Sequence, residues 1–446
     1  MRQLPDPLEE LHRFPLMQAL FGRRARRFGL GMSLPSGPLT FSSQREPHPL
    51  SELEKALLIA AGTGVSGWNF GVPFGPANPA EHGPFTQRFT GRTVPTAAGI
   101  GTPVLFHTDD EGTWLTDTRD VTPSRLRELE DVETDTDRIL AVCREHTVRV
   151  GEERLDLPAA PGHMMEPNFW MANAEGTTLF MPVGDVTEQM LGIMSIFLAN
   201  GYVIRDDLAK RPAGDLSPFV RSGLLDEAKV FPLSVLELST YEASTMELAF
   251  MGHNIVLTLQ AMGLGGLFFN GVNRWSVLGA AAGDGVRGLG FRFVADERWT
   301  VPNPVGLEGH FEGLCPPFHA DMRDAVETFV ERKFGPGGTY DPETPGPWQD
   351  GPGVKGSVSP WTEEFVDCLS EVAGYVHDTY GKFPATVPSM ALTGYVQAHH
   401  LDTEFYDTHH GPGAYLETHA THMSRWHAPA AAEGDLPSPQ KMRRRM

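Results

Sequence analysis

The stretch YEASTMELAFMGHNIVLTLQAM, residues 241–262, decides the fold of this 446-residue chain. Its apolar residues cover most of a helix circumference, and the stretch ends at Gly263, a residue typical of helix C-termini. A helix that is apolar on nearly all sides is expected in the centre of a large fold. His253 and Asn254 are polar positions on this helix, and buried polar groups need partners. The sequence therefore predicts a central helix with polar groups in its second half.

Helices and strands are also predicted before and after this central helix in the sequence. PVLFHT, residues 103–108, has the character of a buried strand and is followed by a turn into a second short strand at 113–115. A helix is predicted from Ser51 to Gly62, because Glu54 completes a capping box with Ser51. By the same criteria, helices are expected over 7–22, 186–200, 322–334 and 361–380, strands over 178–182, 267–270 and 291–294, and a loop over 335–360.

Composition and charge limit the kind of partner. The chain has 57 Asp and Glu against 36 Lys and Arg, a net charge of −21. Nucleic acids and anionic membranes attract basic surfaces, so this balance argues against both. The apolar stretches are interrupted before the ~18 residues that a membrane helix needs, and the N-terminus does not resemble a secretion signal. Three widely spaced cysteines predict no disulfide framework, and a cytoplasmic location is expected.

Three segments could contact a flat or anionic ligand, although each has a plainer interpretation. Four arginines fall between residues 23 and 27, which indicates either an anion site or a solvated basic helix end. GTGVSGWNFGVPFG, residues 62–75, has glycines that let backbone approach a ligand, or it is an ordinary loop. The third segment is HNIVLTLQAMGLGG, residues 253–266, whose final turn could reach a ligand or simply cap the central helix.

Taken together and in this order, the three segments resemble the FMN-dependent nitroreductase family. That family opens with an Arg-x-Ser-x-Arg element, which Arg23 and Arg27 match, while Ala25 replaces the serine. Its central helix reads Gln-Asn, an apolar run and Gly-Leu-Gly. Asn254 lies nine residues before Gly263, as in the family, and GLGG completes the element.

The second family element is Pro-Ser-x-x-Asn-x-Gln-Pro at a helix end. Ser66 and Asn69 match it, whereas Val65 and Gly71 stand where the family has Pro and Gln. The resemblance covers about residues 20–110 and 235–300.

The resemblance implies an α+β fold of the nitroreductase type, with a central, mostly antiparallel sheet flanked by helices. An FMN-binding domain is then expected over residues 1–330, enlarged by an insertion at about 120–230. Residues 331–446 form a C-terminal extension, helical or irregular and rich in histidine, with a frayed tail from about 428.

The implied function is that of a flavin-dependent oxidoreductase that acts on a small organic molecule through FMN held at a homodimer interface. The protein supplies orientation and electrostatics while the flavin carries the chemistry, so no catalytic side chain and no metal are assigned. The residues that the resemblance assigns to FMN are Arg23, Arg27, Ser66, Asn69, Asn254, Gly263, Gly265 and Gly266.

Residues 399–427 carry many histidines together with acidic and aromatic residues, and three interpretations stay open. The segment could be an interface surface, a lid that borders the flavin pocket, or a His/carboxylate metal site in which His419 and His422 share a helix face. We expect the lid, without a stoichiometric metal. A noncatalytic descendant of the fold is a further alternative, because Ala25 and Gly71 depart from the family pattern.

Overall fold

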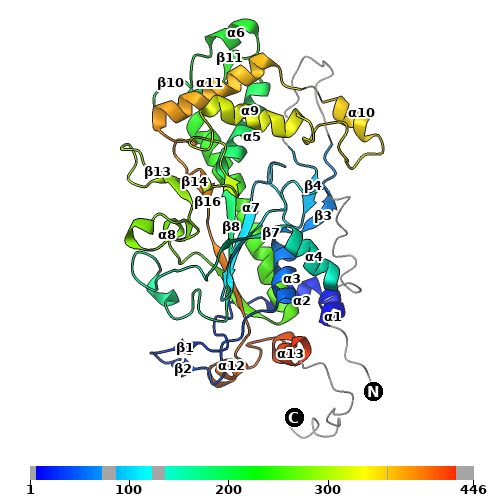
Figure 1. Cartoon of the computed structure of the whole chain (residues 1–446), viewed down its shortest axis with the longest axis vertical. Helices are drawn as coiled ribbons and strands as arrows, with labels where there is room; N and C mark the ends of the chain where they lie inside the picture. Colours follow the sequence, from blue (N-terminus) through cyan, green and yellow to red (C-terminus); the bar gives the residue numbers. More distant parts are fainter. Residues whose placement is uncertain (1–6, 73–86, 123–135, 359, 428–446) are drawn as a thin grey trace.

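The computed structural model describes residues 7–72, 87–122, 136–358 and 360–427, and the tail predicted from about 428 lies outside these residues. The molecule is elongated (Figure 1), with one group of helices at one end, the main sheet in the middle and α12 and α13 at the opposite end. Within the described residues, no helix combines the length and the apolar character that crossing a membrane requires.

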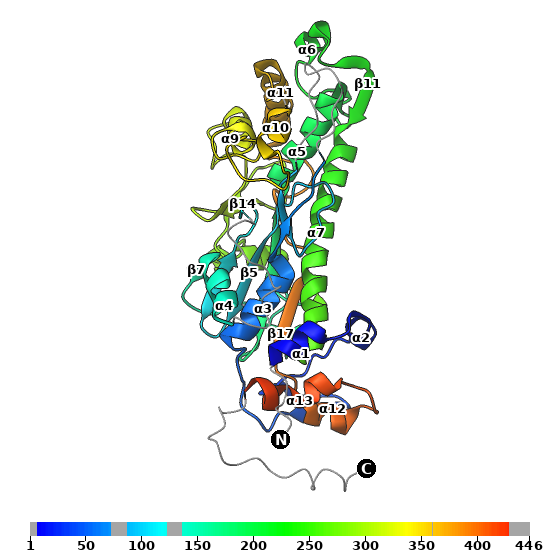
Figure 2. The same ribbon diagram turned by 90° about the vertical axis from the view of Figure 1, so that its right-hand side faces the viewer.

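The predicted central helix exists and is longer than expected. Helix α7 spans Leu233–Met262 and begins directly after Pro232, eight residues before the predicted start at 241. It ends at Gly263, which has a φ of 84°. Its expected burial on all sides is wrong for one face, since Leu238, Met246 and Phe250 are 54%, 45% and 40% exposed. Figure 2 shows α7 running along one side of the molecule.

The main sheet packs against α7, and the strand pairs in it are antiparallel. Its order is β12-β17-β8-β5-β6-β7, and β16 pairs with β8 at one end. Every residue of β8 is buried, so this strand forms the middle of the sheet. The strands are β5 (Val104–Asp109), β6 (Gly112–Thr116), β7 (Thr147–Gly151), β8 (Thr178–Asp185), β12 (Gly265–Phe269), β16 (Met390–Ala391) and β17 (Tyr395–His399).

The predicted domain division does not separate these strands. β8 lies inside the range 120–230 expected to be an insertion, and β16 and β17 lie inside the extension expected past 330. Both ranges contribute central parts of the sheet, so neither is a body set apart from it. The helix α5 (Val186–Ala199) follows β8 directly and is almost entirely buried.

Most other predicted elements are present, with two differences. The helix expected over 7–22 is split into α1 (Pro7–Arg13) and α2 (Leu16–Gly22), because Pro15 lacks the N–H that a continuous helix needs. The loop expected over 335–360 contains the short helix α10 (Gly351–Gly356). The remaining longer helices are α3 (Glu52–Thr63), α4 (Thr136–Glu145), α9 (Met322–Phe334) and α11 (Glu363–Tyr380).

Shorter elements complete the described chain. Three small sheets and hairpins pair β1 with β2, β3 with β4, and β9 with β10 and β11, and a further one joins β13, β14 and β15. Their bounds are β1 (Ser33–Leu34), β2 (Phe41–Ser42), β3 (Val65–Trp68), β4 (Thr90–Arg92), β9 (Tyr202–Asp206), β10 (Arg211–Pro212), β11 (Asp226–Pro232), β13 (Arg292–Val294), β14 (Asn303–Leu307) and β15 (Phe311–Glu312). The short helices are α6 (Ser217–Ser222), α8 (Arg274–Leu278), α12 (Thr403–His409) and α13 (Glu417–Trp426), with 3₁₀ turns at Glu166–Asn168 and Ala282–Asp284.

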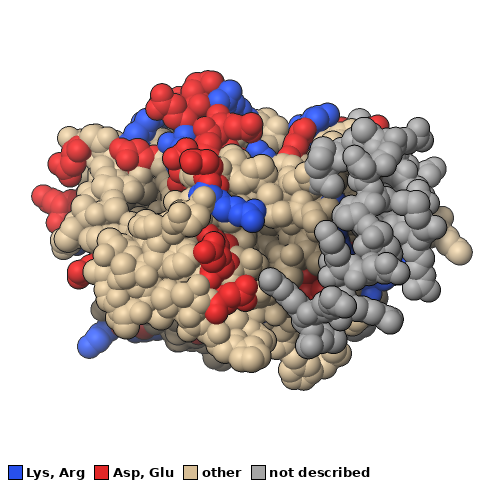
Figure 3. All heavy atoms as spheres, turned by 90° about the horizontal axis from the view of Figure 1, so that it is seen from below, with Lys and Arg blue, Asp and Glu red and all other residues tan. Residues whose placement is uncertain are grey.

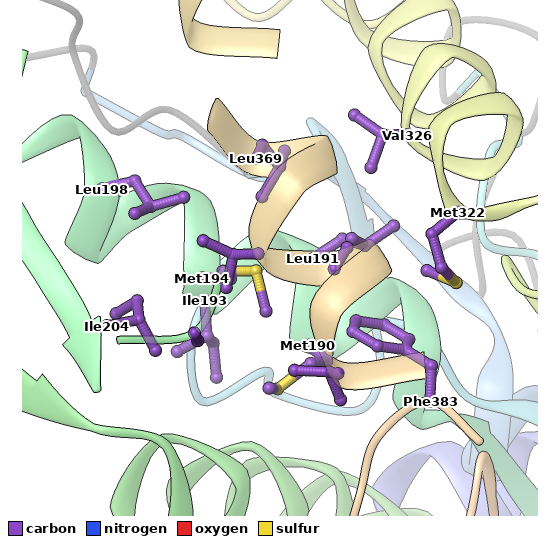
Figure 4. Close-up of a cluster of buried hydrophobic side chains, with 14 of the residues drawn as sticks. Met190, Leu191, Ile193, Met194, Leu198, Ile204, Met322, Val326, Leu369 and Phe383 are labelled. Atoms are coloured by element: carbon purple, nitrogen blue, oxygen red, sulfur yellow. The ribbon is translucent and has the colours of Figure 1, made fainter. Parts of the chain in front are cut away.

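Several apolar clusters of buried side chains hold the fold together, and two of them join its longer helices. One joins α5, α9 and α11, where Met190, Leu191 and Met194 pack against Met322 and Leu369 (Figure 4). The other joins α3 and α7 to the sheet. The burial of these side chains is the main stabilising contribution to the fold, at roughly 1.5–3 kcal/mol for each large apolar side chain.

Candidate functional site

A cleft with a volume of about 820 Å³ lies beside the β3–β4 hairpin. Its lining includes Ser66 and Asn69 from β3 and its turn, Arg92 from β4, and Thr96 from the loop that follows. Helix α7 supports this hairpin, because the Asn254 side-chain amide donates a hydrogen bond to the Thr93 carbonyl at 2.9 Å. The β3–β4 hairpin and the loops beside it therefore form a polar, glycine-rich wall of the cleft, and α7 supports the hairpin through Asn254.

Arg92 gives the cleft a positive charge that no acid among the described residues pairs with. Its terminal nitrogens donate to Thr63 Oγ1 at 2.5 Å and to the Pro103 carbonyl at 2.8 Å, while its Nε has no hydrogen-bond partner among the described residues. No carboxylate of the described residues lies within ion-pair distance of the Arg92 guanidinium. Burial lowers the pKa of Arg92 to about 10. A guanidinium held this way stabilises an anion placed in the cleft.

A second pocket of about 450 Å³ adjoins the cleft and shares Trp68, Arg88 and Thr90 with it. Arg88 is paired here, with Glu188 and with Asp120, both at 2.7 Å. Burial and these two acids act in opposite directions on Arg88, and the acids prevail, so its pKa is raised. Unlike Arg92, this arginine therefore has its charge balanced by the protein.

Lys333 from α9 lines the second pocket together with aromatic residues, among them Phe89 and Phe329. Its ammonium lies 4.8 Å from the centre of the Phe329 ring. Burial lowers the pKa of Lys333 to about 7, although the nearby Glu188 charge raises it. A lysine with a pKa near neutrality can give or accept a proton in ordinary conditions.

The sequence-predicted site residues separate into two groups. Ser66 and Asn69 line the cleft, and Asn254 supports it through Thr93. Arg23 and Arg27 are exposed and lie at the C-terminal end of α7, since the backbone of Arg26 between them pairs with Gly266. One chain does not bring these two groups to one place.

Of the four clustered arginines, Arg26 is the one that points into the protein. It is 2% exposed, and it donates to Gln260 Oε1 at 2.5 Å, to the Ala414 carbonyl at 2.9 Å and to the Gly22 carbonyl at 3.1 Å. The family pattern leaves this position unspecified, so no sequence signal marked it. Its contacts indicate a structural role that ties α2, α7 and the C-terminal segment together.

The GLGG turn is closed by the chain itself. A side chain at Gly263 would place its Cβ 2.1 Å from the Thr418 carbonyl oxygen, and one at Gly266 would lie 2.1 Å from the Gln397 carbonyl oxygen. At Gly265 the nearest atom would be Nε2 of His399, at 2.7 Å. Close packing against β17 and α13 thus explains these glycines, and the turn does not open into the cleft.

The histidine-rich segment 399–427 packs at the same end of α7 as the GLGG turn. Thr418 Oγ1 donates to the Gln260 carbonyl at 2.8 Å, and the His422 ring meets the Met262 carbonyl at 2.8 Å. None of the residues 399–427 lines the cleft or its adjoining pocket.

The sequence did not indicate Arg88, Arg92 or Lys333 as site residues, because no motif marks residues that only the fold brings together.

Comparison with known proteins adds a distant structural neighbour. No protein-family model matches the chain, and no curated protein matches it. A solved structure of a "putative nitroreductase" from Ralstonia eutropha JMP134 is similar over 58% of this chain and 72% of that chain, with 15% sequence identity and a TM-score of 0.25.

Proposed function

We propose that the chain is a flavin-dependent oxidoreductase that holds FMN in the cleft at β3–β4 and acts on a small organic molecule in the adjoining pocket. The observation that carries this proposal is the unpaired Arg92 in a cleft of about 820 Å³. Cofactor sites have volumes of about 300–1,000 Å³ and a few placed polar groups. The ordered motif resemblance to FMN-dependent nitroreductases names the ligand class.

The residues present fit the two parts of FMN. Arg92, a guanidinium without an ion-pair partner among the described residues, suits the phosphate or an anionic ring edge. Ser66, Asn69 and the backbone around Gly91 offer compact polar groups to a flat ring, and Trp68 offers an aromatic face. Bound flavin supplies the transfer of electrons, and these residues orient the cofactor and keep water from it.

Lys333 is the residue that we place at the substrate. The pocket that it lines shares Trp68, Arg88 and Thr90 with the cleft, so a molecule there would lie against the cofactor. With a pKa of about 7, Lys333 can move a proton as electrons pass. Replacing Lys333 with Met should lower turnover about a hundredfold and remove a rate dependence centred near pH 7.

A second copy of the chain completes this site in our proposal. Asn254 supports the cleft and lies nine residues before Gly263, which is about 13 Å along a helix. Exposed Arg23 and Arg27 sit beyond that helix end, too far to join Ser66 and Asn69 around one cofactor in one chain. A homodimer lets the arginines of one copy approach the cofactor held by the other.

The uncovered face of α7 supplies an apolar surface for this partner. Leu238, Met246 and Phe250 follow one another at helical spacing, and α2, which packs on α7, exposes Met17 and Phe21. Figure 2 shows both helices on the same side of the molecule. Exposed apolar side chains on one side of a molecule favour an interaction surface, although the exposed Glu242 interrupts the row on α7.

A titration of FMN into cofactor-free protein tests the proposal, with quenching of flavin fluorescence as the signal. Arg92→Gln should weaken binding about ten- to a hundredfold, since hydrogen bonds to charged groups contribute about 1.5–3 kcal/mol. Arg149→Gln is the control, because that arginine is 44% exposed and does not line the cleft. Absence of FMN binding at high micromolar concentration, or equal affinity of the two variants, would contradict the proposal.

A further inference from the structure

Four ligand-type side chains from distant parts of the sequence meet at the end of the molecule opposite α11. They are Glu54, His400, His422 and His427, and their coordinating atoms all lie within 4.8 Å of one another. Nε2 of His422, His427 and His400 approaches the same oxygen of Glu54, at 2.7, 3.0 and 3.2 Å. We propose that this cluster, the His/Glu centre, binds one divalent transition-metal ion, with zinc as the best match.

Contacts with Ser51 hold the Glu54 side chain in place independently of the histidines. Glu54 is the third residue of α3 and closes its capping box, so Oε2 accepts hydrogen bonds from the Ser51 backbone at 2.6 Å and from Ser51 Oγ at 2.8 Å. This leaves Oε1 directed at the imidazoles. All three imidazoles approach this one oxygen through Nε2.

The tautomers of two histidines are also determined by their surroundings. Nδ1 of His400 lies 2.7 Å from the His48 carbonyl oxygen, and Nδ1 of His422 lies 2.8 Å from the Met262 carbonyl oxygen. A carbonyl only accepts, so each Nδ1 must carry the hydrogen. In the neutral ring, Nε2 then presents a lone pair. Backbone carbonyls hold metal-ligating histidines in this orientation in known metal sites.

These assignments bring three acceptors together, and of the three histidines only His427 keeps a choice of tautomer. The Nε2 lone pairs of His400 and His422 and the Oε1 of Glu54 face one another in a buried space, where the residues are 1%, 2% and 0% exposed. Lone pairs at such distances repel unless a cation lies between them.

The geometry suits a four-coordinate ion. Zinc bonds of about 2.0–2.2 Å to imidazole and carboxylate in a tetrahedron put ligand atoms about 3.3–3.6 Å apart. The three nitrogen-to-oxygen distances, 2.7, 3.0 and 3.2 Å, are all shorter than this, so the side chains would move apart by less than about 1 Å to admit the ion. The rings surround the point from different sides, with centroids 4.8–5.6 Å apart. Imidazole with carboxylate favours zinc or another first-row ion over calcium or magnesium.

The His/Glu centre contains only one of the two histidines that the sequence suggested as metal ligands. His422 belongs to the His/Glu centre, but His419 does not, because its Nδ1 instead accepts from the Leu416 backbone at 3.2 Å. Figure 3 shows this end of the molecule with its charged side chains scattered over a mostly uncharged surface. The His/Glu centre is therefore a built internal cluster rather than the edge of a charged patch.

Four protein ligands with little open space indicate a structural ion that clamps the chain. Glu54 begins α3, His400 follows β17, and His422 and His427 belong to α13 and its end. An ion shared by them would hold residues 403–427 against the C-terminal end of α7. This proposal does not depend on FMN, and a colourless protein that contains metal would leave it intact.

Elemental analysis of untagged full-length protein tests the site. We expect about one equivalent of zinc or another first-row divalent ion per chain. Protein stripped with a chelator should bind Co²⁺ and give the intense visible absorption of a tetrahedral cobalt site. Metal below about a tenth of an equivalent, together with no uptake of Zn²⁺ or Co²⁺ by stripped protein at micromolar concentration, would overturn the proposal.

Variants identify the ligands. Glu54→Gln keeps the capping box, which accepts Gln at this position, but removes the anionic ligand. His427→Gln changes the ligand at the edge of the cluster, where disturbance of the fold is least. Each should lose at least about tenfold in metal affinity, as loss of a ligand does. His419→Ala, a matched change on α13, should keep the metal, and loss of metal from His419→Ala alone would contradict the assignment.

Discussion

Glu54 Oε1 and His422 Nε2 lie 2.7 Å apart, although the two residues are separated by 368 positions in the sequence. This contact joins the first turn of α3 to α13 inside the protein. It also explains why the GLGG turn is covered, since α13 carries Thr418, whose carbonyl oxygen occupies the space above Gly263. The C-terminal segment is thus part of the folded body at this end of α7.

Removing the metal should destabilise the protein. An ion that binds only the folded state adds about 2.7 kcal/mol to the free energy of unfolding when its concentration is 100 times its Kd. Differential scanning calorimetry with and without a strong chelator should therefore show a fall of several degrees in melting temperature. Glu54→Gln should melt at the same temperature with and without chelator, whereas His419→Ala should stay sensitive to it. A chelator-independent melting temperature of the unaltered protein would count against a structural ion.

Arg26→Ala should destabilise the fold by about 2–3 kcal/mol, measured by urea unfolding. The reason is that three acceptors from α2, α7 and the C-terminal segment lose their charged donor. Arg24→Ala is the control, because Arg24 is exposed and its side chain only contacts neighbouring carbonyls. Equal stability of the two variants would mean that the buried contacts of Arg26 contribute nothing.

Lys333→Met should raise the free energy of unfolding at pH 6 by about 1–4 kcal/mol. In the folded chain, burial lowers the pKa of Lys333 to about 7, whereas an exposed lysine titrates near about 10.4. Between these values the unfolded chain holds a proton that the folded chain has released, so this group makes stability rise with pH. The advantage of the methionine variant should shrink as the pH rises from about 7 to about 10.4. If the free energies of unfolding of the two proteins changed with pH in parallel, the pKa of Lys333 would not be lowered in the folded chain.

The chain should form a dimer in solution through the exposed face of α7. Light scattering should give twice 48.9 kDa. The double change Leu238→Glu with Phe250→Glu places two charges on that face and should yield monomers, because burying an unpaired charge in an interface is costly. Val301→Glu is the control, since Val301 is exposed to a similar extent elsewhere. The monomeric variant should also bind FMN more weakly, and monomers with full FMN affinity would refute the shared site.

Local signals predicted local structure well. The capping box at Ser51 and Glu54 marked the start of α3, and the apolar run that ends at Gly263 marked the end of α7. The exposed face of α7 was not predicted, because an all-round apolar helix suits an interface as well as a core. Proline was the local signal that mattered at 7–22, where Pro15 divides the expected helix.

The candidate sites were predicted less completely, because their residues meet only in the folded chain. Nothing near Glu54 in the sequence indicates that His400 and His422 will reach it, since the capping box already explains that residue. Arg92 and Lys333 likewise belong to no motif, and their perturbed pKa values arise from burial. The motif resemblance assigned Ser66 and Asn69 to FMN, and both line the cleft, whereas the glycines that it assigned to FMN pack against the chain itself.

Binding of FMN in the cleft at β3–β4 would be visible in one absorption spectrum of the purified, untagged protein. We expect the absorption bands of a bound flavin, at about one FMN per chain after release by denaturation. A protein without flavin bands, which also fails to acquire them after incubation with excess FMN, would contradict it.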